Sequence, residues 1–386
     1  MALASCQSRN RGQGQAFRHK KAGTKDLVYQ DTAFKALFYS DSNGITGADG
    51  IFSVALDENE TVFFLGDCFL GEVRNNARDM NTPMLRNAFI LLNDKTGEKK
   101  AIYRGEYDAP VTLMEPVNPE GDNTYRWYWP GHGFRKDDIL YVFALSLYNE
   151  PVAVVKSSKK TEDMDQADIL EETMMAFRLS HIDLLSFSLP DFRQLETWKA
   201  DFDYRAHPTD LGNCVMVDKG YVYIYGTRND PDKARIHVAR VPWDAKEFYK
   251  GWEYYTREGW APDIGSSVPI ELDISVSEQF SVFRHGDRYV LLTQERAGTD
   301  IYTYTSSWPY KDFGNKQFIY HTPDNELDTN KRIHAYNALA HPQYIKDGEL
   351  LVSYCVNSIS VRDVFENVDS YRARFIRVPL SIILKD

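Results

Sequence analysis

The sequence predicts an all-β fold, a five-bladed β-propeller, from three observations. A hairpin pattern, two short β-like runs around a polar turn, recurs five times along the 386 residues. Each copy is followed by a further β-like stretch, and the chain is rich in Tyr and Phe, which favour strands. The five copies span residues 51–67, 131–148, 212–228, 279–295 and 338–357.

The stretches that follow the hairpins would complete four-stranded sheets. They lie after Asn87, before His181, and from Arg235, Thr299 and Tyr371 onward. The turns between paired runs, such as Asp-Lys-Gly and Lys-Asp-Gly, are typical of hairpins. We expect early and late segments to pair and close the ring. The alternative is a β-sandwich with extra strands, which the fivefold repeat disfavours. Only residues 160–172 have a helical composition.

The chain divides into a tether over residues 1–25 and a catalytic propeller domain over residues 26–386. The segment Leu3-Ala4-Ser5-Cys6 is similar to the end of a bacterial lipoprotein signal, and a polar tail follows to Gly23. This predicts export, lipidation of Cys6, and a periplasmic or cell-surface location in a Gram-negative bacterium. The alternative is a chance tetrapeptide on a disordered arm.

Charge and cysteine usage restrict the partners. Lys plus Arg total 45 against 56 Asp plus Glu, a net charge of −11, which argues against nucleic acid or an anionic membrane surface. A neutral polysaccharide is compatible. Cys68, Cys214 and Cys355 lack metal-site spacing and are expected to be buried free thiols. No phosphate loop, dinucleotide loop or zinc signature occurs, so no cofactor or metal is expected.

Two carboxylates flank the first repeat. Asp49 ends the glycine-rich segment 44–50, and Asp67 follows the second run of the hairpin. Because a hairpin runs out and back, both acids should lie at one end of it. Glycosidic hydrolysis needs such a pair, one carboxyl as acid and the other as base or nucleophile. The alternative is that both are turn formers, as Asp often is beside Gly.

Polar and aromatic residues near the starts and ends of other repeat strands are candidates for binding substrate. Trp127, Trp129 and Tyr336 could stack on sugar faces, and Glu278 is a reserve carboxylate. Each residue alone is more often structural, and the shared position around a propeller axis is the informative part. The full set is Arg86, Asn87, Trp127, Trp129, His132, Glu278, Tyr336, Asn337, His341 and Asn357.

The segments GADGIFSVAL, TVFFLGDCFLGEV and RNAFILLN resemble the opening of a glycoside hydrolase family of endo-D-arabinanases, and HPQYIKDGELLVSYCVNS with YRARFIRVPL resembles its closing blade. The resemblance implies a five-bladed propeller that cuts α-linked D-arabinofuranose chains. It places the family's essential acids on Asp49 and Asp67. Cys68 stands where the family usually has Thr, and Ala88 where it has Ser.

The sequence therefore predicts an endo-acting arabinofuranan hydrolase that needs no cofactor. Two other classes stay open: a carbohydrate-binding surface lipoprotein without catalysis, and a structural propeller that docks another protein. Only the enzyme requires two facing acids in an open cleft.

Overall fold

The structure is a computed structural model that describes residues 27–118, 121–149, 177–324 and 332–385. Most of these residues lie in strands, which confirms the all-β class. The predicted helix at 160–172 and Cys6 lie outside the described residues. No helix in the described part is long and apolar enough to cross a membrane.

The strands form five large antiparallel sheets, four with four strands and one with five. The first sheet has the order β10 (Lys99–Ile102), β9 (Ala88–Asn93), β4 (Glu60–Leu65) and β3 (Phe52–Ala55). The second contains β13 (Arg126–Lys136), β14 (Ile139–Asn149), β15 (Phe177–Ser188) and β16 (Gln194–Lys199). The third contains β17 (Thr209–Asp218), β18 (Tyr221–Asn229), β19 (Ala234–Pro242), β20 (Glu253–Thr256) and β21 (Gly259–Ala261).

The fourth sheet contains β22 (Ser281–His285), β23 (Arg288–Gln294), β24 (Asp300–Ser306) and β25 (Gly314–His321). The fifth has the order β1 (Tyr29–Gln30), β28 (Arg374–Pro379), β27 (Glu349–Ser358) and β26 (Ile333–Lys346). All five predicted hairpins are present, as β3–β4, β13–β14, β17–β18, β22–β23 and β26–β27. The expected pairing of early and late segments is also confirmed, because Tyr29 and Gln30 pair with Arg377 and Ile376.

Each sheet is buried on both faces, as β4 illustrates. Val62 and Phe64 point into a cluster shared with the second sheet, whereas Phe63 and Leu65 point into a cluster shared with the fifth. This alternation follows from the two-residue period of a strand. Five such clusters lie between the first and second, second and third, third and fourth, fourth and fifth, and fifth and first sheets.

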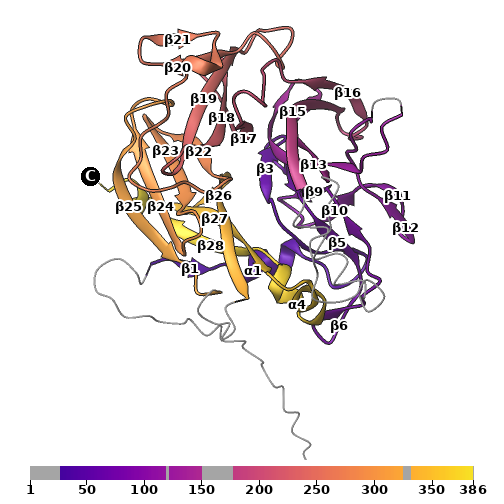
Figure 1. Ribbon diagram of the computed structural model, residues 1–386. Helices are drawn as coiled ribbons and strands as arrows, with labels where there is room; N and C mark the ends of the chain where they lie inside the picture. The colour runs from indigo at the N-terminus through magenta and orange to yellow at the C-terminus, as the bar shows by residue number, and fades with distance from the viewer. Residues whose placement is uncertain (1–26, 119–120, 150–176, 325–331, 386) are drawn as a thin grey trace, which may run out of the picture.

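The first strands of the hairpins contact one another in a closed cycle: β3, β13, β17, β22, β26 and again β3. Figure 1 shows the sheets arranged around the middle of the molecule in this order. Residues at the entries of these strands therefore converge although they are far apart in sequence. This arrangement positions the candidate site.

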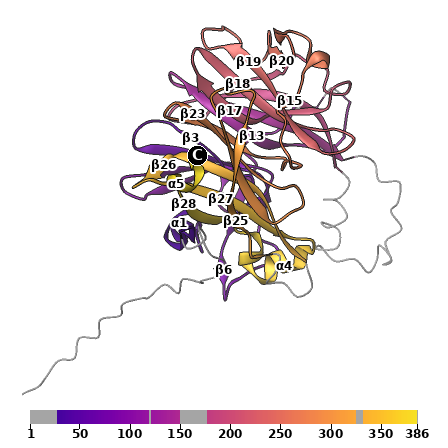
Figure 2. The same ribbon diagram turned by 90° about the vertical axis from the view of Figure 1, so that its left-hand side faces the viewer.

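Several of the remaining elements lie together at one end of the sheets. Figure 2 shows β6 (Val73–Arg74) and α4 (Val361–Glu366) together at that end. A three-stranded sheet has the order β2 (Gly44–Ala48), β5 (Cys68–Gly71) and β8 (Met84–Leu85). The other short elements are α1 (Thr32–Phe38), β7 (Ala77–Arg78), β11 (Arg104–Glu106), β12 (Ala109–Val111), η2 (Ile264–Ser266), η3 (Val368–Tyr371) and α5 (Leu380–Ile383).

Two local expectations were wrong. The stretch from Tyr371 was predicted to be all β-like, but Tyr371 ends η3 and Leu380–Ile383 are helical because Ile382 and Ile383 pack beneath the fifth sheet. The helix α1 was missed, although Asp31 caps it by accepting a hydrogen bond from the Phe34 N–H at 2.9 Å.

Candidate active site

Asp49 and Asp67 lie side by side. The segment 44–50 was expected to be a glycine-rich approach, yet Gly44–Ala48 form β2, and Ala48 pairs with Cys68 of β5. The backbones of the two acids meet directly, since the Asp49 N–H donates to the Asp67 carbonyl at 3.4 Å. The predicted convergence of these acids at one end of the first hairpin is therefore present.

Gly66 makes the close approach possible. Its N–H donates to the Asp49 carbonyl at 2.9 Å. A Cβ atom at this position would lie 2.5 Å from Oδ1 of Asp49, much closer than a carbon and an oxygen can pack. The Gly-Asp pair at 66–67 therefore leaves room for the neighbouring carboxylate.

The carboxyl group of Asp49 is perturbed strongly. Burial raises its pKa to about 7, and the nearby charge of Asp67 adds to the rise. The Tyr336 hydroxyl donates to Oδ2 of Asp49 at 2.8 Å, and the Tyr371 hydroxyl also interacts with this carboxyl; both oppose the rise in pKa. Asp49 is partly exposed, so it can hold or release a proton at neutral pH next to solvent.

Asp67 has a different environment. Only 2% of it is exposed, and its carboxylate accepts from Arg86 Nη1 at 3.2 Å and from Trp129 Nε1 at 3.3 Å. Burial raises its pKa, while Arg86 opposes that rise. So little exposure disfavours direct contact of this carboxylate with a polymer. Its geometry suits it to set the charge and position of Asp49.

Aromatic rings surround Arg86. Its guanidinium lies 4.7 Å from the ring centroid of Trp127 and 5.7 Å from that of Tyr125, and its Nε donates to the Tyr125 hydroxyl at 3.2 Å. Trp127 is only 3% exposed, whereas Tyr125 is 52% exposed. The ring that faces solvent here is therefore Tyr125, which sequence reasoning missed because it precedes the tryptophans in an irregular segment.

The fold satisfies three predicted binding residues, of which Asn87 and His341 are buried and His132 is partly exposed. The Asn87 amide donates to the carbonyls of Met114 and Tyr128 at 3.0 and 2.9 Å. Burial lowers the pKa of His132 to about 4 and that of His341 to about 3, so both imidazoles are neutral. The hydrogen bonds of all three are therefore made within the fold.

The two histidines join first strands of different sheets. His132 on β13 accepts from the Val215 N–H of β17 at 2.9 Å, and its Nε2 lies 3.1 Å from the Ser53 carbonyl of β3. His341 on β26 lies 2.7 Å from the Ser53 hydroxyl and 2.8 Å from that of Ser353. They hold the cycle of strands together.

A second acidic group lies at the third and fourth sheets. Asp210, at the start of β17, accepts from the Tyr204 hydroxyl at 2.8 Å. Burial raises its pKa to about 6, with a further contribution from the negative charge of Glu278 and an opposing one from Arg296. Glu278 forms an ion pair with Arg296, and 46% of its side chain is exposed. Sequence reasoning missed Asp210; its place at the entry of the third repeat was the available signal.

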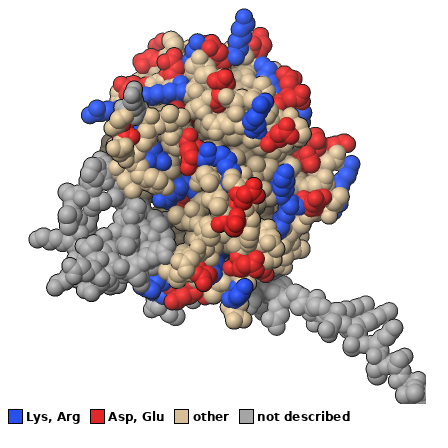
Figure 3. All heavy atoms as spheres, turned by 90° about the vertical axis from the view of Figure 1, so that its right-hand side faces the viewer, with Lys and Arg blue, Asp and Glu red and all other residues tan. Residues whose placement is uncertain are grey.

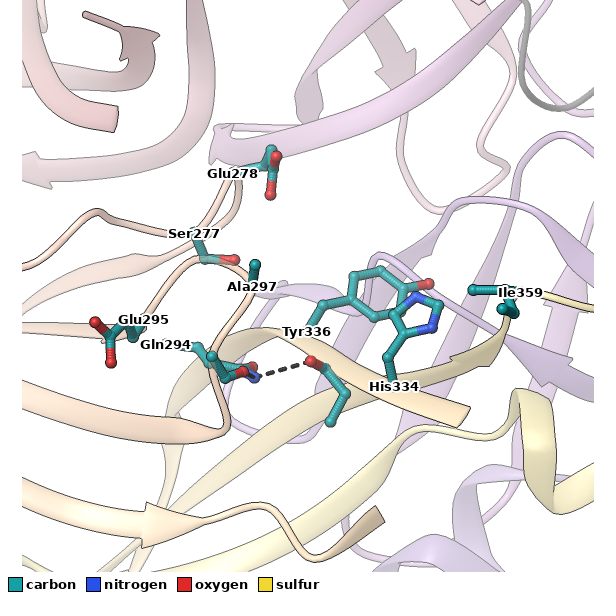
Figure 4. Close-up of a pocket in the computed structure, with 10 residues that line it drawn as sticks. Ser277, Glu278, Gln294, Glu295, Ala297, His334, Tyr336 and Ile359 are labelled. Atoms are coloured by element: carbon teal, nitrogen blue, oxygen red, sulfur yellow. Dashed lines mark hydrogen bonds between the residues drawn. The ribbon is translucent and has the colours of Figure 1, made fainter. Parts of the chain in front are cut away.

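A cavity of about 300 Å³ lies between the fourth and fifth sheets, and it contains Glu278 and Tyr336 in its lining. Figure 4 shows these two residues facing each other across it, with Gln294 and His334 below. Tyr336 also contacts Asp49, so the cavity adjoins the acidic pair.

Two further predicted residues contact residues that line the cavity. Asn337 accepts from the Ser277 hydroxyl at 2.7 Å and from the Gln279 N–H at 3.3 Å, so it holds the segment that bears Glu278. Asn357 interacts with the Tyr336 hydroxyl.

Cys68, Cys214 and Cys355 are free and buried, as predicted. Within the described ranges, no group of three or more His, Cys, Asp or Glu side chains is arranged to hold a metal ion.

Comparison with solved structures places the fold. A protein of Bacteroides ovatus, provisionally described as a hydrolase, matches with a TM-score of 0.73 and 19% identity over 94% of this chain and 93% of that one. A GH43_1 enzyme from Xanthomonas citri in complex with xylotriose matches with a TM-score of 0.49 and 12% identity over 90% of each chain. No protein with curated annotation matches. A family model described as a domain of unknown function, DUF5005, matches residues 31–380, and the chain therefore belongs to this family.

Proposed function

We propose that the protein is a glycoside hydrolase that cleaves α-D-arabinofuranosyl linkages within arabinan-type polysaccharide. The observation that carries this proposal is Asp49, a partly exposed residue whose carboxyl has a pKa of about 7, beside a second carboxylate and a cavity. Groups that exchange protons in catalysis work best when their pKa lies near the working pH. The resemblance of the segments around Asp49 and Asp67 to endo-D-arabinanases supports the choice of sugar.

We take the scaffold to be the five-bladed propeller that the repeats predict. The closed cycle of strand contacts from β3 to β26 supports it, as do the five separate cores between neighbouring sheets. A sandwich would bury one face of each of two sheets, not both faces of five. In a propeller the entries of the first strands meet around the axis, which explains why Asp49, Asp210 and Glu278 gather.

The roles follow from exposure. Asp49 exchanges a proton with the glycosidic oxygen or the attacking water, and Glu278, on the opposite side of the cavity, supplies the second carboxyl. Asp67 acts through Asp49 by its charge, and the charge of Glu278 helps to raise the pKa of Asp210. The sequence favoured Asp49 with Asp67 as the reacting pair. Because only 2% of Asp67 is exposed, we propose Glu278 as the second reacting carboxyl in its place.

The surface charge suits a neutral polymer. Figure 3 shows acidic and basic side chains interspersed over one face of the molecule, without a continuous basic patch. We further propose export and lipid anchoring through Cys6, which would place the enzyme where it meets extracellular polysaccharide.

The decisive experiment incubates the protein with arabinans and, for comparison, xylans, and identifies the released oligosaccharides. Arabinan should yield a ladder of products. Asp49→Asn and Glu278→Gln should each lower the rate by at least about 10²-fold, the usual contribution of general acid–base catalysis. Asp67→Asn should instead shift the pH optimum, because it removes the charge that helps to raise the pKa of Asp49. Wild-type protein that binds arabinan but releases nothing would identify a binding protein instead.

A further inference from the structure

The cavity beside Tyr336 contains a hydrogen-bond acceptor that the protein leaves unused. Gln294, at the end of β23, is 1% exposed, and its Nε2 donates to the carbonyls of Gly298 and Ala335, both at 2.9 Å. Because the two amide hydrogens serve two carbonyls, the orientation of the amide is fixed. Its Oε1 has no hydrogen-bond partner in the described part of the chain. Figure 4 shows this amide among the residues that line the cavity.

His334 supplies a second unused acceptor. Its ring stacks on Tyr336 with centroids 5.3 Å apart, and it interacts with the backbone of Arg332. Burial lowers the pKa of His334, so the ring is neutral and one nitrogen lacks a hydrogen. Nδ1 is buried without a partner among the described residues. Buried polar atoms are normally satisfied, so two unpartnered acceptors on residues that line one cavity favour a ligand that donates hydrogen bonds.

Charge narrows the class of ligand. Glu278 is neutralised by Arg296, and Glu295 adds a further carboxylate to the lining. The lining described for this cavity includes no Lys or Arg. Hydroxyl groups can donate to the unpartnered acceptors, whereas a carboxylate or phosphate on the ligand would meet the like charge of Glu295. The volume of about 300 Å³ is at the small end of ligand pockets, which suits one or two sugar units.

We propose that this cavity is a saccharide subsite next to the cleaved bond, in which Gln294 and His334 accept hydrogen bonds from hydroxyl groups of an uncharged sugar, and from which acidic sugars are excluded. The proposal rests on the proposed function, because it assigns the sugar chain that binds there. It adds residues that select the substrate.

The test measures binding separately from cleavage. Calorimetric titration of the Asp49→Asn protein with arabino-oligosaccharides of increasing length gives affinity without hydrolysis. In this Asp49→Asn background, Gln294→Leu and His334→Phe should each weaken the binding of the longer oligosaccharides by about tenfold. This is the effect of losing one or two neutral hydrogen bonds. Because Gln294→Leu also removes two bonds to the backbone, His334→Phe, which keeps the stacked ring, guards against a folding artefact. Gln194→Leu, the same change on exposed β16, is the matched control and should not alter affinity.

A second arm tests the exclusion of acidic sugars. An oligosaccharide of the same length that carries uronic acid should not bind detectably. Glu295→Gln should reduce the difference in affinity between the neutral and the acidic oligosaccharide. Cleavage by the wild type with unchanged affinity in both subsite variants would overturn the subsite and leave the proposed function standing. If binding depends on Gln294 and His334 but the wild type cleaves nothing, the saccharide subsite would stand and the proposed function would be overturned. Equal binding of neutral and acidic ligands would also overturn the proposed selectivity.

Discussion

Substituting Gly66 by alanine tests whether the exact position of the Asp49 carboxyl matters. The new methyl group would lie 2.5 Å from Oδ1 of Asp49, while its next contacts, to Cγ and the carbonyl oxygen of Asp49, would be 3.6 and 3.7 Å. The backbone of Gly66 is not in the left-handed region, so alanine adopts it without strain. The perturbation is therefore directed at one oxygen atom.

The expected loss of activity follows from the contact between the new methyl group and Oδ1 of Asp49. To reach an ordinary separation of 3.4 Å, Oδ1 must move by about 0.9 Å. Such a rotation also lengthens the 2.8 Å bond from Tyr336 to the same carboxyl. A displacement of about 1 Å in a catalytic group can cost about 10²-fold in rate. An off-rotamer carboxyl costs only about 0.5–1.5 kcal/mol of stability, so the protein should still fold.

The assay compares kcat on arabinan and the thermal melt for wild type, Gly66→Ala and Gly314→Ala. Gly314, at the start of β25, is a matched control because a Cβ there meets no heavy atom within 4 Å and its backbone is also unstrained. We expect a loss of about 100-fold in kcat for Gly66→Ala alone, with little change in melting temperature for either variant. If Gly66→Ala retained wild-type kcat on a substrate that the wild type cleaves, Asp49 would not be the reacting carboxyl.

The other predictions concern charge and location. Burial raises the pKa of Asp49 from 3.8 to about 7, so the folded protein binds this proton more tightly than the unfolded chain does. Stability should therefore fall as the pH rises between these two values. Asp49→Asn should remove this trend, so the variant should gain more in melting temperature over the wild type at pH 8 than at pH 5. Arg86→Met should lower the free energy of unfolding by about 3–5 kcal/mol in denaturant titrations at pH 8, because it leaves the carboxylate of Asp67 buried without its cation. Arg86→Lys, which keeps a positive charge, should lower the free energy of unfolding by less. Asp210→Asn should remove an ionisation near pH 6 from the pH dependence of kcat. An unchanged pH profile would show that Asp210 has no part in the reaction. Metabolic labelling with a fatty acid should mark the full-length precursor but not its Cys6→Ser variant, and equal labelling of both would exclude the anchor.

The hairpins could be predicted because their signal is local. In the segment 212–228, apolar runs flank Asp-Lys-Gly, and both the alternation and the turn residues act within a few positions. The structure forms β17 and β18 there, with Gly220 at a positive φ of 81° in the turn. The short helices were missed because their stability comes from docking. Phe34 and Phe38 of α1 pack on Phe375, more than 300 positions later.

The site could be predicted only in part for a related reason. Asp49 and Asp67 stand out because both flank one hairpin. The partners that set their chemistry come from distant repeats: Trp129 from the second sheet, and Tyr336 and Tyr371 from the end of the chain. Burial also separates residues that look equivalent in sequence, since Trp127 is enclosed while Tyr125 is open to solvent.

The union of β1 with β28 has a consequence for the timing of activity during synthesis. Asp49 leaves the ribosome early, but the two phenols that contact it belong to the last fifth of the chain, and the sheet that holds Tyr336 is completed by Tyr29 and Gln30. A nascent or C-terminally truncated chain therefore has its first carboxylates without the groups that orient them. If the protein is the hydrolase proposed above, we expect hydrolytic competence to arise in one late step, when the two ends of the polypeptide meet, and incomplete translation products to be inert.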